Sequence, residues 1–159
     1  IRDKVTAAVR NEITPILCVG ETKTEHRAGE TRQVLHDQIT TALANLTARE
    51  VAEMVIAYEP VWAISTFDGT LAKPSQIQPM FDYIRKQIAD LYGQRTADKV
   101  RVLYGGSVDE HTARGYMDLN GCDGVLVGGA SINYQKFSEI VKAAHRSQTA
   151  VKEAADGAS

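Results

Sequence analysis

Residues 57–63 read AYEPVWA and place one carboxylate, that of Glu59, at the end of an apolar strand. The apolar run 55–58 is typical of a strand buried in a parallel sheet, and Pro60 ends it because proline cannot donate to the ladder. A carboxylate held there by a rigid element faces the mouth of a site, which suits a general base. The simpler alternative is a solvated glutamate, but Pro60 and the bulky Trp62, which we expect to limit access of water to Glu59, favour the base.

Strands and helices alternate along the rest of the chain. Apolar runs predict strands at residues 16–19, 100–104 and 125–127, and helical spacing predicts helices near residues 5–9, 34–46, 75–91, 110–119 and 137–144, with a polar loop at 21–29. Continuous apolar strands that alternate with helices indicate a parallel α/β sheet. We expect one domain over residues 1–146 and a frayed or disordered tail over residues 147–159, which have few large apolar side chains.

Composition narrows the class of protein. The 159 residues are 43% hydrophobic and carry a formal net charge of −2, which argues against nucleic acid or an anionic membrane as a partner. No apolar run approaches the ~20 residues of a membrane span, and no signal peptide is visible. Cys18 and Cys122 form no CxxC motif and are expected to be buried and reduced, which favours a cytoplasmic location. The histidines show no HxxxH or HxH spacing, so we expect no metal site.

Two later strands end in paired glycines, at residues 104–107 (YGGS) and 127–131 (VGGAS). Either pair alone could be a simple turn. Glycine lets backbone N–H groups come close to a ligand, and a helix that starts behind it adds a positive dipole. Two consecutive strands that end in this way predict a phosphate-binding site.

With residues 16–21 (ILCVGE), these motifs resemble, in order, the last four strands of the triosephosphate isomerase family, over residues 1–144. The resemblance implies the (β/α)8 TIM-barrel fold, of which this chain would hold the four C-terminal βα units. A complete barrel usually needs roughly 200–250 residues, which is more than this chain has.

The same resemblance implies an aldose–ketose isomerase of glycolysis and gluconeogenesis, which interconverts glyceraldehyde 3-phosphate and dihydroxyacetone phosphate through an enediol, without cofactor or metal. Glu59 would be the base that moves the proton between neighbouring carbons. The backbone N–H groups of Ser65, Ser107, Gly128 and Gly129 would bind the phosphate of this small sugar. Glu21 matches a family position that we expect to be structural.

Residues 65–74 (STFDGTLAKP) depart from the family pattern, because the loop is longer and Ser65 stands where the family has glycine. Phe67 and Leu71 add apolar bulk. Three interpretations stay open: a lid that still closes over the triose, a site for a four-carbon ketose phosphate, and a lid that closes poorly.

In the family, a lysine, an asparagine and a neutral histidine from the first four strands complete the site, and nothing in this chain corresponds to them. We therefore expect the chain alone to have little or no activity. The unpaired sheet edges predict pairing with a complementing half-barrel, which is either the N-terminal half of a longer parent chain, the alternative that we favour, or a second copy of this chain. The full-length protein is expected to be a homodimer. The alternative is a non-catalytic half-barrel that binds phosphate or a complementing half.

Overall fold

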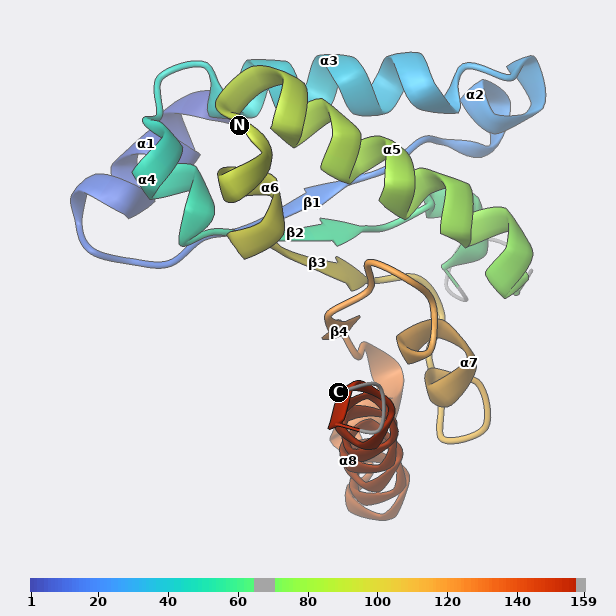
Figure 1. The fold of residues 1–159 in the computed structure, drawn as a ribbon. Helices are drawn as coiled ribbons and strands as arrows, with labels where there is room; N and C mark the ends of the chain where they lie inside the picture. Colours follow the sequence, from blue (N-terminus) through green and yellow to red (C-terminus); the bar gives the residue numbers. More distant parts are fainter. Residues whose placement is uncertain (65–70, 157–159) are drawn as a thin grey trace.

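A four-stranded parallel sheet forms the centre of the computed structural model, which describes residues 1–64 and 71–156 (Figure 1). The strands lie side by side in chain order, β1 (Ile16–Val19), β2 (Val55–Tyr58), β3 (Arg101–Tyr104) and β4 (Gly124–Val125). The predicted strands at 16–19 and 55–58 are confirmed, whereas the last strand is shorter than residues 125–127 and starts one residue earlier. The parallel register aligns Cys18 with Ala57 and Ala57 with Leu103, so the carboxyl ends of the strands share one edge.

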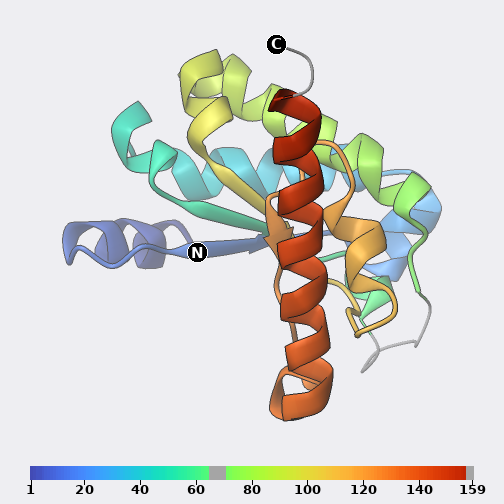
Figure 2. The ribbon, with the colours of Figure 1, turned by 60° about the horizontal axis from the view of Figure 1, so that its bottom comes forward.

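Helices connect the strands, and the long α3 and α5 lie on one face of the sheet (Figures 1 and 2). The helices are α1 (Arg2–Arg10), α2 (Lys23–Ala28), α3 (Thr31–Leu43), α4 (Ala48–Ala52), α5 (Pro74–Tyr92), α6 (Gln94–Lys99), α7 (Ala113–Met117) and α8 (Tyr134–Asp156), with 3-10 turns η1 (Val61–Ala63) and η2 (Gly129–Ile132). Within residues 1–64 and 71–156, no helix combines the length and the apolar character that a membrane span requires.

Residues 21–29 are not the continuous polar loop that we expected, because they contain α2. The Thr22 N–H donates to Glu25 Oε2 at 2.7 Å and the Glu25 N–H donates to the Thr22 hydroxyl, a capping box that stabilises even a short helix. Gly29, at φ 75°, ends the helix in the left-handed conformation.

The predicted domain boundary at residue 146 falls inside α8, whose backbone continues to Asp156. Residues 147–156 of the expected tail are therefore helical in their backbone, and residues 157–159 lie outside the described part of the chain.

Side chains alternate across β1, and only one of its faces is covered. Leu17 and Val19 point to the helices and are buried, whereas Ile16 on the opposite face is 49% exposed. Cys18 shares the face of Ile16 and is exposed, so the prediction of a buried Cys18 was wrong. In the barrel that the family resemblance implies, this inner face would belong to the interior, which a four-stranded sheet does not close. The core lies instead between the outer face and the helices, built on side chains such as Ile56, Tyr58, Val102, Tyr104, Leu35, Ile39, Phe81 and Ile84.

Candidate active site

Glu59 follows β2 at the carboxyl edge of the sheet. Its N–H donates to the Val19 carbonyl at 2.7 Å, so the β1–β2 ladder fixes its backbone. Glycines on both neighbouring strands make room for it: a Cβ at Gly20 would lie 1.9 Å from the Glu59 carbonyl oxygen, and one at Gly105 would lie 2.5 Å from the Glu59 Cγ. The Glu59 residue therefore occupies space that only glycine leaves open.

A cavity of about 870 Å³ lies at the same edge and brings together residues from the ends of three strands. Its wall includes Glu59 after β2, Ser107 after β3, and Gly128 and Gly129 after β4. The predicted base and three of the four predicted phosphate donors thus surround one space. The fourth, Ser65, lies outside the described residues.

The donors differ in their present bonding. The Ser107 N–H donates to the Ala63 carbonyl at 3.0 Å. Gly129 opens the turn η2, and the first N–H groups of a helical turn have no partner within it. Gly128 and Gly129 are both exposed, so their backbone can be approached from the cavity.

Three polar side chains that the sequence did not point to also contribute to the cavity. Asp109, Asn133 and Lys136 also line it, and Lys136 Nζ lies 3.5 Å from Glu110 Oε1. Their position on segments that follow the two Gly-rich strand ends was the available signal, since such segments lie at the carboxyl edge of a parallel sheet. Within the described residues, no group of His, Cys, Asp and Glu side chains is arranged to hold a metal ion.

The surroundings of the Glu59 carboxylate raise its pKa. Loss of solvent around the carboxylate raises its pKa above the ordinary value, and a hydrogen bond from the Cys18 thiol opposes that shift. Although Cys18 is exposed overall, partial loss of solvent around its sulfur, followed by the charge of Glu59, raises the pKa of Cys18 to about 11. The thiol is therefore protonated at neutral pH, where it can donate to the carboxylate and is a poor nucleophile.

The raised pKa of Glu59 makes stability depend on pH. The folded state binds this proton more tightly than the unfolded chain, so the stabilisation that it provides is present below the ordinary value of 4.5 and is lost as pH rises through the folded pKa. Glu59→Gln is therefore expected to raise the free energy of unfolding at pH 7 and to change it less at pH 4. Urea unfolding at both values tests this, with the exposed Glu53→Gln as control; an equal effect of Glu59→Gln at both pH values would contradict it.

A second carboxylate, that of Glu21, is fully buried and holds the segment around Glu59. It accepts hydrogen bonds from Trp62 Nε1 at 2.7 Å, from the Tyr58 hydroxyl at 3.1 Å and from His26 Nδ1 at 3.2 Å. His26 also stacks on Trp62, with ring centroids 4.3 Å apart. Burial, reinforced by the charge of Glu21, raises the pKa of Tyr58 well above its usual range.

Trp62 therefore has a different role from the one we expected. Its indole N–H points to Glu21, and Trp62 does not line the cavity that contains Glu59. Because Tyr58 and Trp62 flank Glu59 in the chain, their shared acceptor fixes the turn on both sides of the candidate base. Glu21 thus anchors the position of Glu59.

Trp62→Phe should lower the free energy of unfolding by roughly 2 kcal/mol, because it leaves a buried carboxylate without one of its donors. Tyr92→Phe is the matched control, since the Tyr92 hydroxyl donates at 2.6 Å to the neutral Leu43 carbonyl, and we expect a loss near 1 kcal/mol. Urea unfolding followed by circular dichroism compares them. A Trp62→Phe loss no larger than that of the control would contradict a strong bond to Glu21.

Comparison with known proteins finds relatives of this chain in one family. The family model described as triosephosphate isomerase matches residues 1–144. The triosephosphate isomerase of Pediococcus pentosaceus is 48% identical over 141 residues, which are 89% of this chain and 55% of that protein. That of Citrifermentans bemidjiense is 44% identical over 142 residues, 89% of this chain and 56% of the relative. The chain thus spans about half the length of these curated relatives.

The family match agrees with the parallel sheet, the helix order and the glycine-rich strand ends, and it confirms the predicted α/β fold of the TIM-barrel class. The family model and both relatives are described as triosephosphate isomerase, which confirms the predicted enzyme family. The chain belongs to the triosephosphate isomerase family.

Proposed function

We propose that this chain supplies the general base and the phosphate site of an aldose–ketose isomerase that interconverts glyceraldehyde 3-phosphate and dihydroxyacetone phosphate. The observation that carries the proposal is the cavity that Glu59 shares with Gly128 and Gly129. A carboxylate with a raised pKa and a set of backbone donors line the same space, which is large enough for a small sugar phosphate. The proposed setting is the cytoplasm, in glycolysis and gluconeogenesis.

In the proposed reaction, the ionised Glu59 removes the proton α to the substrate carbonyl and returns it to the neighbouring carbon of the enediol. The raised pKa strengthens the carboxylate as a base. The N–H groups of Gly128, Gly129, Ser107 and Ser65 would bind the phosphate. For Ser107 this requires that its N–H leave the Ala63 carbonyl. No cofactor or metal takes part.

We further propose that the chain works only with a complementing half-barrel. The inner face exposes Ile16 and Cys18, and the sheet ends at the unpaired edges of β1 and β4. In the family, the groups that stabilise the enediolate come from the first four strands, and losing one such donor typically costs about 10²–10³ in rate. The proposed assembly of the full-length protein is a homodimer.

A coupled assay with glyceraldehyde 3-phosphate tests the proposal. It is run on the chain alone and on the chain mixed with the first four βα units of the Pediococcus pentosaceus relative. We expect little turnover alone, turnover in the mixture, and loss of most of it with Glu59→Asp but not with the exposed control Glu53→Asp. Turnover that Glu59→Asp leaves unchanged would rule out Glu59 as the base.

Leu71 favours a second candidate substrate. This side chain lines the cavity and is 52% exposed, so it adds an apolar surface where a larger sugar phosphate could lie. The rest of the unusual loop, including Phe67, lies outside the described residues. If a four-carbon ketose phosphate is the substrate, its kcat/KM in the mixture should exceed that of the triose, and Leu71→Ala should reduce the preference. Phosphate binding without turnover of either sugar would instead indicate the non-catalytic half-barrel.

A further inference from the structure

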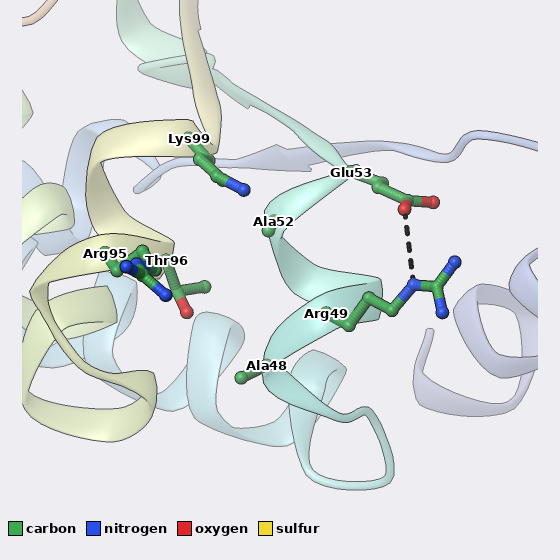
Figure 3. Close-up of a pocket in the computed structure, with 7 residues that line it drawn as sticks. All are labelled: Ala48, Arg49, Ala52, Glu53, Arg95, Thr96 and Lys99. Carbon is green, nitrogen blue, oxygen red and sulfur yellow. Dashed lines mark ion pairs between the residues drawn. The ribbon is translucent and has the colours of Figure 1, made fainter.

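A second pocket lies at the opposite edge of the sheet (Figure 3). It sits between α4 and α6, which end just before β2 and β3, so it lies near the amino ends of these strands. Its volume is about 410 Å³, and it shares no lining residue with the cavity of Glu59. The pocket is lined by Ala48, Arg49, Ala52, Glu53, Arg95, Thr96 and Lys99.

Positive charge dominates this pocket, with three cations and one carboxylate. Arg95 and Lys99 are four residues apart on α6, where like charges on one helix face repel each other. In the described part of the chain, neither forms an ion pair. Asp98, the acidic residue of the same helix, accepts instead from Gln94 Nε2 at 2.8 Å. Within the described residues, no carboxylate therefore lies at ion-pair distance from either cation of α6.

The third cation, Arg49, is held only weakly. Its Nε lies 3.8 Å from Glu53 Oε1, and the two side chains are 91% and 72% exposed, so solvent screens the pair. Figure 3 shows Arg49 turned from α6 towards Glu53, while the ammonium of Lys99 points across the gap towards Ala52. The small side chains of Ala48 and Ala52 leave the space between the helices open.

We propose that this pocket binds a diphosphate or polyphosphate group, held by Arg95 and Lys99 with Arg49 turning in from Glu53. A guanidinium binds phosphate oxygens through two parallel hydrogen bonds, and an ammonium adds a point charge. The volume falls in the range of small-molecule sites and exceeds the space that a single phosphate needs. Since barrel enzymes carry out catalysis at the carboxyl ends of their strands, this is a second site, separate from the one that contains Glu59.

Titration of the ¹⁵N-labelled chain with pyrophosphate at low ionic strength, followed by NMR, tests the proposal. We expect shifts at the amides of residues 95–99 and 48–53, and weaker binding of inorganic phosphate. The double variant Arg95→Gln/Lys99→Gln should raise the Kd of this site at least tenfold. The matched control Lys86→Gln/Arg114→Gln removes two exposed charges elsewhere and should change it less than twofold.

Three results would overturn the proposal: shifts confined to Ser107, Gly128 and Gly129, equal Kd values for the two double variants, or equal affinity for phosphate and pyrophosphate. The substituted side chains are exposed, so we expect both variants to fold, which circular dichroism checks. If the double variant does not fold, Lys99→Gln alone is used, and a Kd that it leaves unchanged overturns the proposal equally.

Discussion

Gly20→Ala should lower the free energy of unfolding by at least about 3 kcal/mol, the upper end of the usual cost of overpacking. The new Cβ would lie 1.9 Å from the carbonyl oxygen of Glu59 and 2.4 Å from its carbonyl carbon. Both atoms belong to backbone, so no side chain can rotate away. The Glu59 backbone is itself held by its 2.7 Å hydrogen bond to Val19.

The backbone of Gly20 is also held in place by hydrogen bonds. Its N–H donates to Gln38 Oε1 at 2.8 Å, and its carbonyl accepts from Gln38 Nε2 at 3.1 Å, which ties the end of β1 to α3. Relief of the clash must therefore break either this pair or the β1–β2 ladder.

Urea unfolding of the wild type, Gly20→Ala and the control Gly115→Ala measures the effect. A Cβ at Gly115, inside α7, meets only Pro74 Cγ at 3.7 Å, which is an ordinary contact. We expect the control to be neutral or slightly stabilising, because alanine suits a helix better than glycine. A Gly20→Ala loss below about 1 kcal/mol would show that the two strands separate more easily than these contacts imply.

The strand that carries Glu59 could be predicted because its signals are local. Four apolar residues followed by Glu59 and Pro60 specify the strand, its end and the position of the carboxylate within a few neighbouring residues. The glycine-rich ends of the next two strands are local signals too, and parallel topology brings all of them to one edge. The cavity that contains Glu59, Gly128 and Gly129 follows from the local sequence signals and the parallel topology together.

The contacts that sequence analysis missed join distant residues. Trp62 and Glu21 are 41 positions apart, and no local pattern shows that the indole donates to that carboxylate. Cys18 was misplaced for a similar reason, because an apolar strand is expected to be covered on both faces. The face of β1 that holds Cys18 carries no covering helix in the described structure, so its exposure depends on the extent of the barrel and not on the strand sequence.

Gly105→Ala should lower kcat about 100-fold in the complemented isomerase while changing stability little. The new Cβ would lie 2.5 Å from the Glu59 Cγ and 2.9 Å from Oε1, so the end of the candidate base must move. A flexible side chain can do this at small cost in folding free energy, unlike the backbone beside Gly20. A displacement of about 1 Å from the reacting carbon is enough to cost about 10² in rate.

Measuring kcat and phosphate affinity separately distinguishes a displaced Glu59 side chain from a disturbance of the whole cavity. The three nearest atoms to the new methyl group all belong to the Glu59 side chain, whereas the proposed donors Gly128 and Gly129 follow β4 and the Ser107 N–H is held by the Ala63 carbonyl. The affinity for inorganic phosphate should therefore stay within about twofold of the wild type, and kcat alone should fall. Gly115→Ala, assayed in the same mixture, should leave both quantities unchanged. If Gly105→Ala keeps full kcat, Glu59 does not need the position seen here. If it loses phosphate affinity together with kcat, the substitution has disturbed the whole cavity, and the separate roles proposed for the base and the donors would have to be abandoned.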